Sequence, residues 1–160
     1  MPTKQEQERQ EPPPNEEQQT FLLRIERTIA APRARVFEAF TNPDDLSRWS
    51  APQGLDVAEG SIDLRVGGRW MVVMRDSATG RRYQAEGTYR EIMPPERLVY
   101  THSWPTDETP VETLITVEFH EEGDATRVVM LHEGFVNEAS RNGHREGWSS
   151  CFDRLEEMFA

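Results

Sequence analysis

Alternating hydrophobic and polar positions run through most of the chain. Phe21, Leu23 and Ile25 alternate with polar or charged side chains, which predicts a first strand with one buried face. Six later stretches carry strand patterns separated by turn residues, at 55–62, 69–75, 82–92, 97–104, 111–121 and 126–132. Because short loops join these successive strands, we expect an antiparallel sheet.

Helical patterns occur directly after the first strand and at the end of the chain. The first short helix starts near Pro32 and is ended by Asn42-Pro43, and a second covers 44–49 with acidic residues in its first turn. A long helix over 137–159 has Asn137 as its expected N-cap. Its apolar residues recur at three- and four-residue spacing, namely Trp148, Cys151, Phe152, Leu155, Met158 and Phe159.

This order of elements predicts an α+β domain with a helix-grip fold. A curved antiparallel sheet of about six or seven strands would surround the long C-terminal helix, with two short helices after strand one. The long helix must bury its apolar stripe on the sheet. A twisted sheet that curls around a single helix leaves space at its open end, so the architecture suggests a cavity.

The first twenty residues differ in composition from the rest. Gln, Glu and Pro dominate them, and Met1 is their only apolar residue apart from the prolines. Such a segment buries too little surface to offset the entropy lost on ordering. We therefore expect a disordered tail over 1–20 and one domain over 21–160.

Charge narrows the range of partners. The chain carries a net charge of −11, and residues 21–160 carry −8 of it. An acidic surface repels phosphate backbones and anionic lipid, so neither nucleic acid nor membrane is an expected partner.

A single cysteine, the lack of a signal-peptide pattern and the lack of an apolar run of about 20 residues favour a cytoplasmic protein.

The candidate binding residues follow from side-chain alternation along the strands and from the helix stripe. The residues predicted to line a cavity are Trp49, Trp70, Met74, Tyr89, Tyr100, His102, Trp104, His132, Gly147, Trp148 and Cys151. Aromatic rings offer large contact areas, methionine adapts to irregular ligands, and the tyrosines and histidines offer orienting hydrogen bonds. The alternative is that these side chains simply fill a core.

Two glycines inside regular elements admit more than one explanation, and two further histidines are expected outside the site. Gly147 interrupts the long helix, which indicates either close contact between helix and sheet or room for a ligand beside Trp148. Gly87, inside a strand, admits the same two explanations or a bulge. His120 and His144 are expected at the solvent-exposed surface.

Sequence signatures of catalytic and metal sites are missing from the chain. It has no His-Glu-x-x-His, Cys-x-x-Cys or Gly-x-Ser-x-Gly motif, so we expect neither a zinc site nor another cofactor. Cys151 falls on the apolar stripe of the last helix, where a buried, unreactive thiol is expected. His102 paired with a tyrosine remains a candidate acid–base pair.

Short stretches from about residue 22 onward occur in a characteristic order. They are Ile29-Ala30-Ala31-Pro32, Val36-Phe37, Ala39-Phe40, Trp49, Asp63-Leu64-Arg65-Val66-Gly67-Gly68-Arg69-Trp70, Gly87-Thr88-Tyr89, Glu91-Ile92, Pro95-Glu96-Arg97-Leu98-Val99-Tyr100, Thr116-Val117-Glu118-Phe119, Thr126, His132 and Gly147-Trp148. In this order the chain resembles the START-like (SRPBCC) superfamily of polyketide cyclases and birch-pollen-allergen-like proteins. The most similar branch is the one named after the C-terminal domain of the heat-shock-protein ATPase activator.

The resemblance implies the helix-grip fold but spans several functions. We favour a non-catalytic carrier or sensor of a small apolar or amphipathic molecule. One alternative is a cyclase- or hydrolase-type enzyme that uses His102 or His132. The other is a chaperone-activator-like module whose acidic surface meets a basic protein, although residues 1–20 do not resemble the other half of such an activator. A homodimer through a sheet edge stays open.

Overall fold

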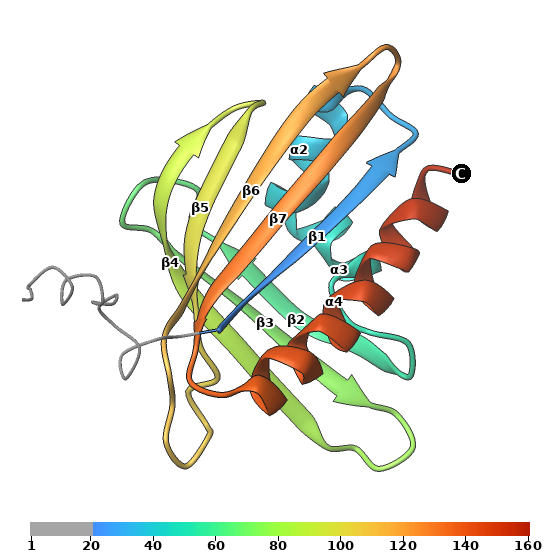
Figure 1. Ribbon diagram of the computed structural model, residues 1–160. Coiled ribbons are helices and arrows are strands. Elements are labelled where there is room, and N and C mark those ends of the chain that lie inside the picture. The colour runs from blue at the N-terminus through green and yellow to red at the C-terminus, as the bar shows by residue number, and fades with distance from the viewer. Residues whose placement is uncertain (1–20) are drawn as a thin grey trace, which may run out of the picture.

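The computed structural model describes residues 21–160, and the tail expected over 1–20 lies outside the described residues. One curved antiparallel sheet holds the long helix against its concave face (Figure 1). Its strands are β1 (Phe21–Ile29), β2 (Leu55–Ile62), β3 (Arg69–Asp76), β4 (Arg82–Met93), β5 (Arg97–His102), β6 (Thr113–Glu122) and β7 (Ala125–Phe135). The helices are α2 (Arg33–Thr41), α3 (Pro43–Trp49) and α4 (Glu138–Met158). The predicted helix-grip α+β fold is confirmed.

The strand order places the chain's first strand beside its last. The seven strands of the described chain run β1-β7-β6-β5-β4-β3-β2, and every neighbouring pair is antiparallel. Strands β2 to β7 form a simple meander, whereas α2 and α3 carry the chain from β1 at one edge to β2 at the other. The two short helices therefore bridge the sheet, with α2 against β6 and β7 and α3 against β2 and α4.

The break between the short helices is set by Asn42 and Pro43, as predicted. Helix α2 ends at Thr41, and the Asn42 Oδ1 atom accepts hydrogen bonds from the backbone N–H groups of Asp44 at 2.9 Å and Asp45 at 3.2 Å. Pro43 occupies the first position of α3, where its missing N–H costs nothing. The Arg35 guanidinium binds both oxygens of the Asp45 carboxylate, at 2.7 and 3.1 Å, and fixes α2 against α3.

Helix α4 starts where the sequence predicts it. The Asn137 Oδ1 atom accepts a hydrogen bond from the Ser140 N–H at 2.7 Å, and Cys151, Phe152 and Leu155 are buried on its inner face. The Arg27 guanidinium on β1 binds Asp153 on the helix at 2.8 Å. Neither α4 nor another helix among residues 21–160 is long and apolar enough to cross a membrane.

Aromatic side chains pack closely where α2 and α3 meet the sheet. The Phe40 ring lies 4.6 Å from Trp49 and 5.2 Å from Phe119 between centroids, and Trp49 lies 5.8 Å from Phe152. These edge-to-face and tilted rings join α2, α3, α4 and β6 in one solid core. Because the core fills this part of the concave face, any open space under α4 must lie beyond it.

Three strand boundaries differ from the prediction by two residues or more. The strand expected over 97–104 ends at His102, because Ser103 makes only an isolated bridge with Glu86. The strand expected to end at residue 132 continues to Phe135, since the ladder with β1 runs to that residue. The strand expected from residue 111 begins at Thr113.

Gly87 marks a close approach between β4 and its neighbours. A Cβ atom there would overlap the Thr101 carbonyl oxygen and lie 2.6 Å from the Trp70 Nε1 atom, which donates to that same carbonyl at 3.0 Å. This close approach to the neighbouring strand β5 differs from the explanations expected from the sequence, which were contact with the helix, room for a ligand or a bulge.

Replacing Gly87 with alanine is expected to lower the free energy of unfolding by about 2–4 kcal/mol, because backbone must shift and the Trp70 bond is lost. Urea unfolding measures this change. Gly60→Ala is the matched control, since a Cβ at Gly60 has only Met71 O at 3.8 Å, an ordinary contact. Equal stabilities for the two variants would contradict the prediction.

Candidate functional site

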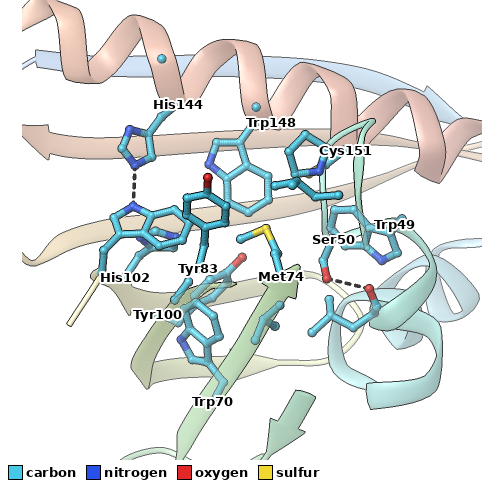
Figure 2. Close-up of a pocket in the computed structure, with 18 of the residues that line it drawn as sticks. Trp49, Ser50, Trp70, Met74, Tyr83, Tyr100, His102, His144, Trp148 and Cys151 are labelled. Atoms are coloured by element: carbon cyan, nitrogen blue, oxygen red, sulfur yellow. Dashed lines mark hydrogen bonds between the residues drawn. The ribbon is translucent and has the colours of Figure 1, made fainter. Parts of the chain in front are cut away.

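A cavity of about 410 Å³ lies between the concave face of the sheet, α3 and α4. Figure 2 shows His144, Trp148 and Cys151 projecting from the helix toward Tyr100, Met74 and Trp70 on the sheet, with Trp49 and Ser50 to one side. The volume falls in the range of small-molecule sites, about 300–1,000 Å³. Phe40 and Trp49 form its border with the aromatic core.

Strand alternation brings the sheet residues to the cavity wall. Strand β3 contributes Trp70, Val72 and Met74, one residue in every two, because successive side chains point to opposite faces. Strand β5 contributes Tyr100 and His102 in the same way. Of the eleven residues predicted to line a cavity, ten lie at this wall: Trp49, Trp70, Met74, Tyr89, Tyr100, His102, Trp104, Gly147, Trp148 and Cys151.

The eleventh predicted residue, His132, lies behind the wall in a closed hydrogen-bond chain. The Trp148 Nε1–H group donates to His132 Nδ1 at 3.0 Å, so the ring proton resides on Nε2 and donates to Thr113 Oγ1 at 2.7 Å. The Thr113 hydroxyl in turn donates to the His102 carbonyl oxygen at 3.0 Å. Burial, reinforced by His102 and His144, lowers the pKa of His132 to about 2. His132 therefore ties α4 to the sheet as a neutral imidazole.

The sequence predicted a solvated side chain for His144, but the structure places it at the cavity wall. It is half-buried at the cavity wall, and its Nε2 atom accepts a hydrogen bond from the Trp104 indole at 2.9 Å. Its Nδ1–H group donates to the Ser140 carbonyl one turn earlier, at 2.8 Å. Position 144 lies one turn before Trp148. Extending the apolar stripe of the helix by one turn toward the N-terminus would therefore have indicated His144 as a wall residue. His120 lies away from the cavity and contacts Glu118 at 3.2 Å.

The glycines of α4 border open space. A Cβ atom added at Gly147, or at Gly143 one turn earlier, would meet no atom within 4 Å. Close contact between helix and sheet at Gly147 is therefore wrong as an explanation. Both glycines line the cavity, and the missing side chains enlarge it along the helix.

His102 is a buried polar residue at the cavity wall. The residue is 5% exposed and lines the cavity, yet within residues 21–160 no hydrogen bond reaches either ring nitrogen. The rings of Trp104 at 5.2 Å and Trp70 at 5.6 Å flank it. Burial, with a smaller contribution from His144, lowers the pKa of His102 to about 3, so the imidazole is neutral.

Tyr89, Tyr100 and Cys151, also at the wall, are uncharged as well. Burial raises the pKa of the Tyr89 and Tyr100 hydroxyls, and it raises the pKa of the Cys151 thiol to about 12, which leaves no thiolate nucleophile. Within residues 21–160, no Asp, Glu, Lys or Arg lines the cavity. Among residues 21–160, no three His, Cys, Asp or Glu side chains gather closely enough to hold a metal ion.

Several wall residues were missed by the sequence analysis. Tyr83 shares strand parity with Ala85 and Tyr89, so the alternation along β4 would have indicated it. The segment after α3 carries no such signal, because Arg154 on α4 positions it by donating to the carbonyls of Ala51 at 2.6 Å and Leu55 at 3.1 Å. The missed residues are Phe40, Leu46, Ser50, Pro52, Leu55, Val72, Tyr83, Ala85, Ala139, Ser140, Gly143 and His144.

Comparisons with known proteins agree with this architecture. The family model described as activator of Hsp90 ATPase homolog 1-like protein matches residues 30–160. A protein from Rhizobium leguminosarum is similar in structure, with a TM-score of 0.75, 30% identity and coverage of 88% of this chain and 95% of that one. No curated protein matches the chain.

Two further solved structures are similar over most of their length. A protein from Chromobacterium violaceum has a TM-score of 0.79 and 25% identity, with coverage of 86% of this chain and 96% of that one. The AHSA1 protein from Silicibacter pomeroyi has a TM-score of 0.72 and 27% identity over the same shares of the two chains.

Proposed function

The chain belongs to the family described as activator of Hsp90 ATPase homolog 1-like protein, and from this premise we propose that its cavity binds a small apolar or amphipathic molecule. The protein would act as a non-catalytic carrier or sensor. The fold of the family is compatible with ligand binding and with protein binding. The choice between these functions must therefore be argued from the properties of the cavity.

The observation that carries the proposal is a cavity of about 410 Å³ that the side chains around it leave open. Its wall is mostly aromatic and aliphatic, with a few uncharged polar groups, as is typical of small-molecule sites. Gly143 and Gly147 widen it, although alanine at either position would favour the helix by about 1 kcal/mol. Glycine at these two positions lowers the stability of the helix but keeps the cavity open, which supports a role of the cavity in binding.

The chemistry of the wall supports binding rather than acid–base catalysis. A general base works best when its pKa lies near the working pH. Burial lowers the pKa of His102 to about 3 and that of His132 to about 2, and the ring of His132 is already held by Trp148 and Thr113. Both imidazoles would be weak bases at neutral pH. A cytoplasmic location and a homodimer remain predictions from the sequence.

Filling the cavity tests the proposal. We expect the uncharged fluorophore 1-aminoanthracene to bind the native chain with enhanced, blue-shifted emission, because the wall is apolar. Gly147→Phe should weaken this binding by at least about tenfold, equivalent to about 1.4 kcal/mol, since the new ring occupies the space. Fluorescence titration measures both values.

Arg145→Phe is the control variant, because it adds the same ring at an exposed position of α4 outside the cavity wall. It should bind 1-aminoanthracene as the native chain does. Equal loss in both variants would indicate a general effect of the added ring. Unchanged binding in a folded Gly147→Phe variant would exclude the cavity as the binding site.

A further inference from the structure

We infer that the bound molecule is an uncharged aromatic or cyclic compound whose hydroxyl or carbonyl group hydrogen-bonds to His102. This inference rests on the proposed function, because it specifies the ligand of the same cavity. It follows from one buried imidazole without a partner, from the lack of charge at the cavity wall, and from the arrangement of the surrounding rings.

The His102 imidazole requires an explanation because buried polar groups are almost always hydrogen-bonded. The residue is 5% exposed, and no group within the described residues bonds to either ring nitrogen. A buried donor or acceptor left unsatisfied costs about 1–3 kcal/mol. The neighbouring His132 lies only 5.1 Å away between centroids but has both ring nitrogens bonded, so of these two buried histidines it is His102 whose ring lacks a partner within residues 21–160. Because His102 lines the cavity, a ligand can reach it.

The neutral state of His102 defines what it can bind. A neutral imidazole offers one N–H donor and one acceptor nitrogen, which suits a hydroxyl, a carbonyl or an amide. Tyr100 lies two residues earlier on the same face of β5, is 9% exposed and also lines the cavity. Its hydroxyl is a second uncharged polar group at the wall, and the Cα atoms of the two residues are about 7 Å apart along the strand.

An ionised ligand group would lack a partner in this cavity. No Asp, Glu, Lys or Arg of the described part of the chain lines it, so neither a carboxylate nor an ammonium group would find an opposite charge there. Moving an unpaired ion from water into such a site is far more costly than moving an uncharged polar group. The same argument excludes phosphate and sulfate esters.

The rings around His102 indicate the shape of the ligand body. Trp70 and Tyr100 pack edge to face at 5.6 Å and 82°, and Tyr89 and Tyr100 pack at 6.0 Å and 64°. The Trp104 ring stands edge-on to His102 at 78°. Aromatic rings prefer offset-stacked and edge-to-face partners, so a flat ring suits this wall better than a flexible alkyl chain.

A matched set of naphthalene derivatives tests the inference by calorimetric titration. 2-Naphthol, 2-methylnaphthalene and 2-naphthoate share one ring system and differ in a hydroxyl, a methyl and a carboxylate group. We expect 2-naphthol to bind about tenfold more tightly than 2-methylnaphthalene, as one added hydrogen bond of about 1.4 kcal/mol gives. 2-Naphthoate should bind the most weakly of the three.

The variant His102→Phe should abolish the preference for 2-naphthol while it still binds 2-methylnaphthalene. Nitrogen-15 NMR of the native chain adds a measurement that does not depend on the variant. On addition of 2-naphthol, the ring nitrogens of His102 should shift, whereas those of His132 should not, because Trp148 and Thr113 already bond to them.

The outcomes separate this inference from the proposed function. Equal affinities of the native chain for 2-naphthol and 2-methylnaphthalene, or tightest binding of 2-naphthoate, would overturn the inference and leave cavity binding in place. The same holds if 2-naphthol binds without any shift of the His102 nitrogens. Failure of all three compounds and of 1-aminoanthracene to bind would overturn both proposals.

Discussion

Trp49→Ala is expected to lower the free energy of unfolding by about 3–5 kcal/mol, as large-to-small changes of buried aromatic residues do. Trp49 is 1% exposed, and its indole N–H donates to the Ala39 carbonyl at 2.9 Å. Its ring packs on Phe40 and Phe152, which joins α3 to both α2 and α4. Removing it leaves a void at the junction of three helices and opens the wall of the cavity. Urea unfolding measures the loss.

Two variants identify the source of that loss. Trp49→Phe keeps an aromatic ring but removes the indole donor, and it should cost about 1–3 kcal/mol because the Ala39 carbonyl is left unsatisfied. Val66→Ala changes a side chain that is 63% exposed and should stay within about 0.5 kcal/mol of the native chain. A loss below about 1 kcal/mol for Trp49→Ala would show that the helices are not held together at this residue.

Local patterns were sufficient to predict the fold. Alternation along β3 and β5, the break at Asn42-Pro43 and the apolar stripe of α4 each involve residues close in the sequence. A helix with one apolar face and a sheet with one apolar face bury each other, so the architecture follows from the order of elements. The strand alternation also predicted that Trp70, Tyr100 and His102 lie on the same face of the sheet.

The details of the site depend on pairings that no local pattern encodes. His144 accepts from Trp104, forty residues earlier, and His132 accepts from Trp148 on another element. The way α4 packs across the sheet determines these hydrogen-bond partners. The sequence alone therefore predicted His144 at the surface and His132 at the cavity wall. Gly147 shows the same limit, because its spacing indicates an interrupted helix but not what lies opposite the missing side chain.

Acidification from pH 7 to pH 5 is expected to lower the free energy of unfolding by about 4 kcal/mol. Burial lowers the pKa of His102 to about 3 and of His132 to about 2, whereas an unfolded histidine has a pKa of about 6.5. Below pH 6.5 the unfolded chain therefore binds protons that the folded protein does not. The stability is present in full above that pH and is lost as the pH falls toward the folded pKa values. Urea unfolding across this range measures the slope.

His102→Phe should halve this pH dependence, to about 2 kcal/mol, because it removes one of the two buried imidazoles. The change breaks no hydrogen bond of the ring within the described residues, so stability at pH 7 should stay nearly constant or rise. His120→Gln keeps both buried imidazoles and should keep the whole loss. If His102→Phe retained the native slope, water or another group would have to solvate His102 in the folded protein. His102 would thus both select the ligand and supply about half of the acid sensitivity of the fold.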